Sequence, residues 1–203
     1  MKQRLQSRRE FIGTSVATAV TAVTVVAAGS SLIGSATALA AGAVPTCAPP
    51  LKANAADEII NNLRQLKNVW HGFPVDQLTH GLQTATLAMR AGESPEIIVA
   101  SLCHDMAKTV SALNHEEMAA EMLKPYLSSD TYNMLKYHGI FQGRFFWDEI
   151  DRDPNYYLKF RGERWYDLAM KFTEVYDKPA FKKDANFEPL ETFIPIIRRV
   201  VGV

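Results

Sequence analysis

The side chains best suited to chemistry in this sequence are five histidines and one aspartate that directly follows a histidine. The pair is His104-Asp105, in the mostly apolar or small stretch SLCHDMAKTV. Four of the histidines fall on predicted helices or at their ends, namely His80, His104, His115 and His138. Buried polar groups need partners, and imidazole nitrogen and carboxylate oxygen are donors that suit iron, zinc or manganese. This set therefore predicts a metal site, whereas His71 has no place in the pattern and is assigned to the surface or to a cap.

The adjacency of His104 and Asp105 constrains how they bind metal. Neighbouring residues on a helix point about 100° apart. The two side chains therefore share one ion only at the edge between their directions, or else Asp105 extends to a second ion. This spacing indicates a carboxylate that bridges two ions.

The elements that position these residues are predicted to be helices. Apolar residues at helical spacing, with capping signals, predict helices over 57–69, 76–90, 95–109, 115–124, 129–138, 163–176 and 188–200. Ser94, Asn114 and Ser128 or Ser129 are the expected caps. The segment 141–160, FQGRFFWDEIDRDPNYYLKF, is rich in aromatic residues and broken by turns. No stretch alternates with period two, so we predict an all-α bundle of about six to seven helices around a dinuclear metal site.

The first 40 residues have the composition of an export signal. Residues 1–10 hold four basic side chains and one acidic one, and no charged residue follows between Phe11 and Leu51. The uncharged stretch is apolar and contains the small-x-small site Ala38-Leu39-Ala40. A positive region, an apolar region and such a site together predict a secretory signal.

The string Ser7-Arg8-Arg9-Glu10-Phe11-Ile12 resembles the twin-arginine signal. We therefore expect residues 1–40 to be a signal read by the twin-arginine export machinery, 41–56 a linker and 57–203 the folded domain. The protein would then be periplasmic or extracellular. The alternative is an uncleaved membrane anchor, since about 20 apolar residues span a bilayer. The frequent Thr, Ser and Gly in this stretch favour export.

The charge balance bears on possible partners. The chain has 22 basic and 22 acidic side chains, a net charge of zero. Nucleic-acid binding normally requires a basic surface, so no nucleic-acid partner is expected, and no stable protein partner is predicted.

The order of the candidate ligands resembles the HD-domain superfamily of helical metalloproteins, and in it the di-iron HD oxygenases, the group of myo-inositol oxygenase and the phosphonate-cleaving HD oxygenase. The similarity runs through QLTHGLQTATLA from Gln77, VASLCHD ending at Asp105, His115-Glu116, Tyr137-His138 and EVYDK from Glu174. It covers roughly residues 57–200, nearly all of the predicted domain.

The resemblance implies a specific ligand set. One ion would be held by His80, His104, Asp105 and Asp177, and Asp105 would bridge to a second ion held by His115 and His138. From the residues alone Asp177 cannot be chosen, because Asp148, Asp167 and Asp184 compete with it. The resemblance implies two metal ions, with iron expected first and manganese, zinc or magnesium as alternatives.

A second group of residues is expected to contact substrate. Lys108, one turn after Asp105, can direct a cation into the same pocket; the matching lysine of myo-inositol oxygenase contacts substrate. The alternative is a solvated lysine near a helix C-terminus, where the dipole favours it. Gln83, Tyr137 and Arg144 are weaker candidates. The aromatic cluster, assigned to core or lid, comprises Phe141, Phe145, Phe146 and Trp147.

Two functions fit these residues. The first is a mixed-valence di-iron oxygenase that uses O₂ to cleave a C–C or C–P bond of a small hydroxylated substrate. The second is a phosphohydrolase in which two divalent ions activate a water, and here Lys108 would neutralise phosphate charge. The phosphonate-cleaving oxygenase has His where this chain has Lys108 and an upstream Tyr where it has Trp70, so its particular substrate does not transfer.

Overall fold

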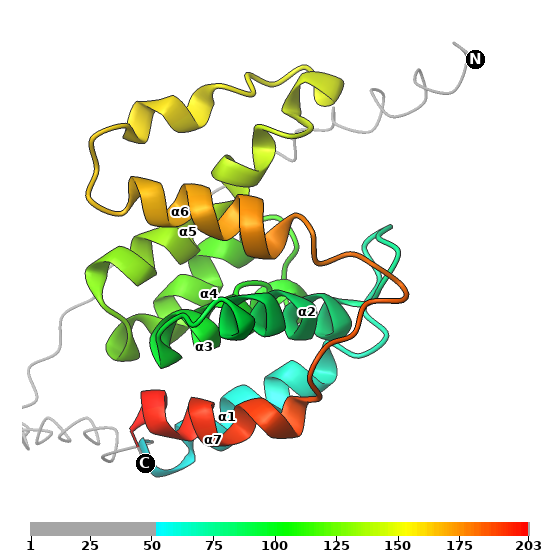
Figure 1. Ribbon diagram of the computed structural model, residues 1–203, viewed down its shortest axis with the longest axis vertical. Coiled ribbons are helices and arrows are strands. Elements are labelled where there is room, and N and C mark those ends of the chain that lie inside the picture. The colour runs from blue at the N-terminus through cyan, green and yellow to red at the C-terminus, as the bar shows by residue number, and fades with distance from the viewer. Residues whose placement is uncertain (1–51, 203) are drawn as a thin grey trace, which may run out of the picture. The chain divides into compact units, whose positions relative to one another are not determined.

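The computed structural model describes residues 52–202, and within that range the fold contains only helices and loops (Figure 1). The seven α-helices are α1 (Lys52–Gln65), α2 (Gln77–Arg90), α3 (Pro95–Cys103), α4 (His115–Leu123), α5 (Ser129–Gly143), α6 (Tyr166–Lys171) and α7 (Leu190–Val201). The predicted all-α class is confirmed.

Three of the α-helices, α2, α3 and α5, begin at a side-chain cap. The side chains of Asp76, Ser94 and Ser128 accept hydrogen bonds from the backbone N–H three residues later, which satisfies a donor that the helix leaves free. Asn114 lies at the cap position of α4, but its side chain makes no capping bond. The expected cap at Asn114 is therefore wrong, although the helix begins where it was predicted.

The bundle is built around α2 and α3, which pack against each other in its centre (Figure 1). α4, α5 and α6 pack in sequence on one side, and α1 lies beside α7 on the other. α7 buries Leu190, Phe193, Ile197 and Val201, a spacing of three to four residues that places them on one helical face. Two chain segments far apart in sequence thus close the bundle.

The helix predicted to run to Thr109 ends earlier. α3 stops at Cys103, and a 3₁₀ helix, η1 (Met106–Thr109), follows. Asp105 lies in the break with φ −103° and ψ 6°, in the bridge region where active-site residues are found. The prediction of one continuous helix is wrong here, because the chain turns at the His104-Asp105 pair.

The second half of the bundle also departs from regular α-helix. α5 extends beyond His138 to Gly143, and three short 3₁₀ helices appear, η2 (Lys124–Tyr126), η3 (Trp147–Ile150) and η4 (Tyr156–Phe160). α6 continues as a π-helix, η5 (Phe172–Asp177). π-turns inside helices occur frequently at functional sites, and this one ends at the predicted ligand Asp177.

Some predictions fall on the N-terminal residues. The twin-arginine signal of residues 1–40 lies outside the described residues, as does most of the linker 41–56. α1 begins at Lys52, ahead of the start predicted at 57. None of the helices in residues 52–202 is both long enough and apolar enough to cross a membrane.

Candidate metal centre

Three buried side chains from three separate segments meet at the first candidate ion position. His80 comes from α2, His104 follows α3 and Asp177 ends η5. The Nε2 atoms of the two histidines lie 3.0 Å apart, and Asp177 Oδ1 lies 3.1 Å from His80 Nε2 and 3.6 Å from His104 Nε2. All three residues are at most 2% exposed. They form a group with the spacing of metal ligands.

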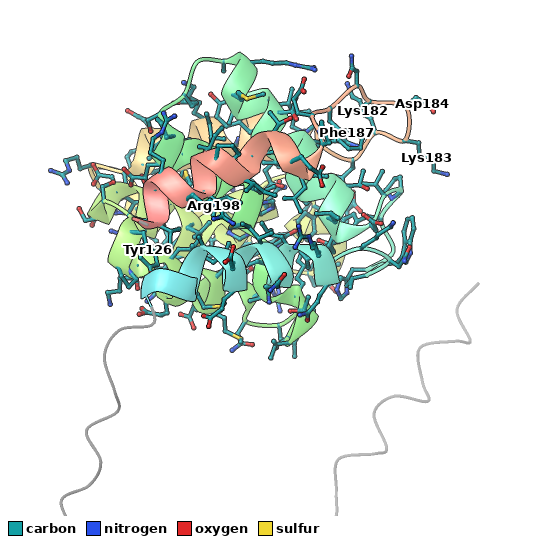
Figure 2. The ribbon with its side chains drawn as sticks, turned by 90° about the horizontal axis from the view of Figure 1, so that it is seen from below. Tyr126, Lys182, Lys183, Asp184, Phe187 and Arg198 are labelled. Carbon is teal, nitrogen blue, oxygen red and sulfur yellow. The ribbon has the colours of Figure 1, made fainter. Side chains whose placement is uncertain are left out.

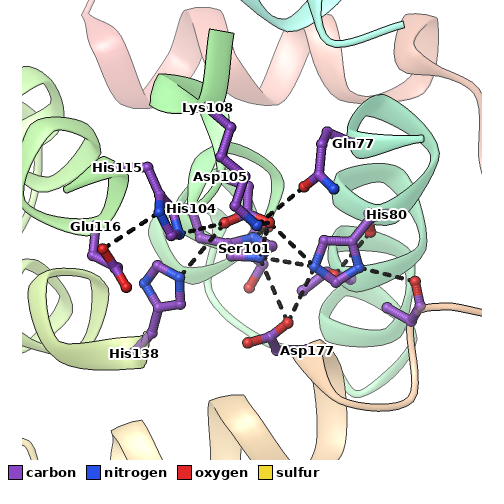
Figure 3. Close-up of polar contacts among 12 residues, drawn as sticks. Gln77, His80, Ser101, His104, Asp105, Lys108, His115, Glu116, His138 and Asp177 are labelled. Carbon is purple, nitrogen blue, oxygen red and sulfur yellow. Dashed lines mark hydrogen bonds and ion pairs between the residues drawn. The ribbon is translucent and has the colours of Figure 1, made fainter. Parts of the chain in front are cut away.

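Asp105 lies between this group and two further histidines (Figure 3). Its Oδ2 lies 3.3 Å from His104 Nε2 and 3.6 Å from His80 Nε2. Its Oδ1 lies 2.9 Å from His115 Nε2 and 3.7 Å from His138 Nε2. The two oxygens of one carboxylate thus face two different pairs of histidines, which is the arrangement that a bridging ligand requires.

The second candidate ion position comprises a group of three close residues and one further histidine. His104, Asp105 and His138 lie close enough together to hold one ion. His115 joins them through its contact with Asp105 Oδ1. His115 is the first residue of α4 and His138 lies in α5, and these helices pack against each other.

All four histidines are oriented by the backbone. In each, Nδ1 lies within hydrogen-bond distance of a backbone carbonyl oxygen. The distances are 2.9 Å from His80 to Ala180 O, 2.8 Å from His104 to Ser101 O, 2.9 Å from His115 to Ala112 O and 2.6 Å from His138 to Leu135 O. A carbonyl only accepts, so Nδ1 carries the proton and Nε2 keeps its lone pair. Metal-bound histidines are oriented in this way.

The arrangement of these ligand atoms suits a bound cation. Nε2 lone pairs of His80 and His104 face each other at 3.0 Å, which is repulsive unless a positive charge lies beside them. Asp105 Oδ1 and Asp177 Oδ2 are buried without a hydrogen-bond donor, and buried unpaired acceptors are costly. A metal ion satisfies all of these atoms together, so the residues present fit the two-ion site that the sequence predicts.

The electrostatics hold the ligands in the forms that bind metal. Burial opposes the ionisation of Asp105, but its close contacts with the imidazoles of His104 and His115 and with the ammonium of Lys108 keep its pKa well below the usual range. Burial likewise opposes ionisation of Asp177, whose pKa is nevertheless lowered, chiefly by His104 and His80. Burial lowers the pKa of His104 and so favours its neutral form. Metal binding needs deprotonated ligands.

His138 shifts in the opposite direction. Burial lowers its pKa, but the hydrogen bond and the charge of Asp105 outweigh burial and raise it. The negative field that attracts a proton to His138 also attracts a metal cation to the same point.

Lys108 lies in the pocket, where it was expected. Its Nζ donates to Asp105 Oδ2 at 2.6 Å and to Gln77 Oε1 at 3.2 Å. The side chain is 11% exposed, so it is not the freely solvated lysine of the alternative interpretation. η1 holds Lys108 beside the carboxylate.

The weaker substrate candidates lie elsewhere. Gln83 is buried and bonds to the backbone of Lys182. Tyr137 packs against Phe160 and Trp165. Arg144 pairs with Glu174 at 3.2 Å, and none of the three lines the cavity above the ligands. Sequence spacing placed them near the site but could not show which way they point.

The competing aspartates are also separated from the centre. Asp148, Asp167 and Asp184 are exposed, and Figure 2 shows Asp184 on the loop before α7, projecting outward. Asp177 is held inside because Tyr176, the preceding residue, donates to Glu93 at 2.5 Å. Lys171 also pairs with Glu93 at 2.6 Å. These contacts anchor the π-helical turn that presents Asp177.

A cavity of about 710 Å³ opens above the ligands. Its lining includes residues that sequence reasoning did not select, namely His71, Phe73, Glu116 and Phe181. Phe181 stacks on the His80 ring with centroids 3.9 Å apart, and Glu116 Oε2 lies 3.4 Å from His115 Nδ1. Glu116 follows a predicted ligand directly and belongs to the His115-Glu116 stretch of the resemblance, but it was not selected as a site residue. The aromatic cluster divides, since Phe141 is in the core while Phe145, Phe146 and Trp147 line the cavity.

Comparison with known proteins agrees with this geometry. The family model for the HD domain matches residues 78–157. The chain is also 35% identical over 78 residues to a [1-hydroxy-2-(trimethylamino)ethyl]phosphonate dioxygenase (glycine-betaine-forming) of Leisingera caerulea. That alignment covers 33% of this chain and 40% of the relative, so the chain spans less than half the length of the curated protein it matches.

Proposed function

With an HD domain over residues 78–157 as the premise, we propose that this protein is a dinuclear metalloenzyme in which Asp105 bridges two ions. The observation that carries the proposal is the division of the Asp105 oxygens between two histidine pairs, at 3.3 Å from His104 and 2.9 Å from His115. If Asp105 served only the ion at His80 and His104, which also have Asp177, the Nε2 atoms of His115 and His138 would face no carboxylate of the proposed ligand set.

The remaining ligands divide between the two positions. One ion would be held by His80, His104, Asp105 and Asp177, and the other by Asp105, His115 and His138. The residues between ligands and solvent also have roles: Phe181 covers one face of His80, and Lys108 presents a cation beside the bridging carboxylate. Lys108 would bind the anionic or hydroxylated end of a substrate and orient it toward the ions.

The reaction class that we propose is oxygenation by a mixed-valence di-iron centre, with cleavage of a C–C or C–P bond of a hydroxylated substrate. Iron supplies redox chemistry with O₂. The support is the identity to a protein named as a phosphonate dioxygenase, together with a site of four histidines and two aspartates. The phosphonate of that relative is an anion that a lysine in the position of Lys108 would suit.

Hydrolysis of a phosphoester is the second candidate. Lys108 Nζ lies 2.6 Å from Asp105 Oδ2, so a positive charge stands beside the two ion positions, where a phosphoryl group would approach. Two ions that stabilise attacking and leaving oxygens are a recognised route to hydrolysis. The two candidates need the same ligands and differ in the metal bound.

Metal content decides between them. The protein would be purified anaerobically, its metals quantified per chain, and EPR recorded after partial oxidation. Two irons per chain with a mixed-valence signal would support the oxygenase. Two zinc, manganese or magnesium ions without iron would support hydrolysis, and less than one ion of any metal per folded chain would contradict both.

We also propose export through the twin-arginine route, on the basis of the N-terminal sequence. Cell fractionation and N-terminal sequencing of the mature protein would test it. Replacement of Arg8 and Arg9 by Lys should retain the protein in the cytoplasm. Unchanged export of that variant would exclude the twin-arginine route.

A further inference from the structure

The cavity above the ligands is larger than a small polar substrate needs. Liquid water takes about 30 Å³ per molecule, so about 710 Å³ has room for roughly 24 non-hydrogen atoms at that density. A hydroxylated phosphonate or acid of about ten such atoms would fill less than half. The ligands and Lys108 occupy the floor, so the unused space lies toward the opening.

The wall toward the opening is apolar. Beyond the polar floor, the lining includes Ile140, Phe145 and Trp147. Trp147 packs so closely on α5 that a Cβ at Gly143 would lie 2.2 Å from its indole ring. Only glycine permits this approach, so α5 and the start of η3 form one fixed wall.

Four large apolar side chains at this cavity are exposed, and we name them the apolar rim: Phe73, Leu113, Phe146 and Ile150, at 42%, 96%, 43% and 53% exposure. They come from three segments, the loop before α2, the turn between η1 and α4, and the η3 region. Nine large hydrophobic side chains are exposed in the described part of the chain, so almost half gather at one opening. Clustered exposed apolar side chains mark an interaction site.

We propose that the apolar rim binds the apolar arm of an amphiphilic substrate, whose polar hydroxylated or anionic end lies at Lys108 and the ion positions. This inference rests on the proposed function of the same site and names its substrate class. The arm, an alkyl or aryl chain, would run from the floor along Ile140 and Trp147 to Leu113 and Ile150. It would bury side chains that water otherwise contacts.

The position of the rim favours substrate over a protein partner. The rim side chains line the same cavity as the ligands, so a partner seated on them would close the route to the ions. The two cations of the upper lining, Lys178 and Arg152, are exposed and lie over the rings of Phe145 and Trp147 at 3.8 Å and 5.6 Å. Their charged groups remain in solvent. The aliphatic parts of these two side chains and the ring faces of Phe145 and Trp147 add apolar surface to the cavity wall.

The test is a chain-length series on the metal-loaded protein. Methyl-, butyl- and octylphosphonate would be titrated by calorimetry, with methylphosphonate as the reference ligand for each protein. A fully buried methylene contributes about 0.8 kcal/mol, about fourfold in affinity. Allowing for an open cavity, we expect butylphosphonate to bind at least tenfold more tightly than methylphosphonate, and octylphosphonate more tightly again.

Variants distinguish binding at the apolar rim from nonspecific hydrophobic binding elsewhere on the protein. Leu113→Ser and Ile150→Ser should reduce the octyl-to-methyl affinity ratio several-fold. Met122→Ser removes an exposed side chain outside this cavity, at 46% exposure against 53% for Ile150, and should keep the ratio of the unaltered protein. An octyl-to-methyl affinity ratio near one in the unaltered protein, or no binding of any of the three phosphonates, would overturn the inference.

Two further outcomes are informative. If the rim variants alter the oligomeric state by light scattering and leave the ratio unchanged, the rim is a contact between copies of the chain and the inference is overturned. Finding zinc in place of iron would refute the oxygenase but leave the chain-length result standing, because the rim residues do not contact the ligands' donor atoms. The failure of one proposal is therefore distinguishable from failure of the other.

Discussion

Gln83 makes both hydrogen bonds of its side-chain amide with the backbone of Lys182: its Nε2 donates to Lys182 O at 2.8 Å, and its Oε1 accepts from Lys182 N at 3.1 Å. In the same segment, the carbonyl oxygen of Ala180 accepts a hydrogen bond from His80 Nδ1, and the ring of Phe181 stacks on the His80 ring. Gln83 therefore positions His80, a proposed metal ligand, and does not itself line the cavity.

The first prediction concerns this amide clamp. Gln83→Glu places a carboxylate oxygen against Lys182 O and loses a donor, so the segment should shift and His80 should lose its orientation. We expect binding of the first ion to weaken by about tenfold to a hundredfold, as for loss of a partner that orients a metal ligand. Chelator competition would measure it.

Arg90→Ala is the matched control. Arg90 also extends from α2 to a backbone carbonyl of the same connection, Asn186 O at 3.1 Å, but it is exposed and remote from His80. It should leave metal affinity unchanged. Equal losses in the two variants would show that Gln83 supports the fold generally and has no specific effect on the centre.

The second prediction separates the bridging ligand from a single-ion ligand. Asp105→Ala should remove both ions, because one carboxylate faces both histidine pairs. His115→Ala should reduce the content from two ions to one. Metal analysis per folded chain, with circular dichroism as the control for folding, would measure this, and two ions retained by Asp105→Ala would refute the bridge.

The third prediction concerns Lys108. Its ammonium lies beside the ion positions, and hydrogen bonds to charged groups contribute about 1.5–3 kcal/mol. Lys108→Ala should therefore keep its metal and bind methylphosphonate about tenfold to a hundredfold more weakly by calorimetry. Lys124→Ala, at an exposed position on η2, is the control. An unchanged dissociation constant in Lys108→Ala would show that Lys108 does not contribute to substrate binding.

The fourth prediction is the pH dependence of the α2 cap. Burial opposes ionisation of Asp76, but hydrogen bonds from the backbone N–H groups of Thr79 and Asn68 lower its pKa. A carboxyl with a lowered pKa stabilises the fold above its unfolded pKa of about 3.9. That contribution is lost as the pH falls through the folded pKa.

Asp76→Ala should therefore reduce the free energy of unfolding by about 1–2 kcal/mol at pH 7. The difference from the unaltered protein should start to shrink below about pH 4 and should vanish once Asp76 is protonated in the folded protein as well. Urea unfolding of the chelator-treated proteins at several pH values would measure this without a metal contribution. Asp148→Ala, at an exposed position, is the control, and a difference that stays constant down to pH 2.5 would contradict the cap.

The sequence by itself predicted the fold class, which the structure confirms, and four candidate histidine ligands, which the structure brings together. Helical periodicity and caps such as Ser94 are local properties, so they predict helices without knowledge of the packing. Four histidines in apolar or helical surroundings pointed to metal because buried imidazoles need partners. Asp177 could be selected only by resemblance, since local sequence does not distinguish it from Asp148, Asp167 or Asp184.

The tertiary structure decided how those residues meet. The helix break at His104-Asp105, the π-helical turn before Asp177 and the inward amide of Gln83 depend on contacts such as Tyr176 with Glu93 and Gln83 with Lys182. The first of these contacts joins residues 83 positions apart and the second joins residues 99 apart. Tertiary packing overrides local propensity at such points, so the distances of the two Asp105 oxygens from the two histidine pairs and the apolar rim of the cavity are known only once the chain is folded.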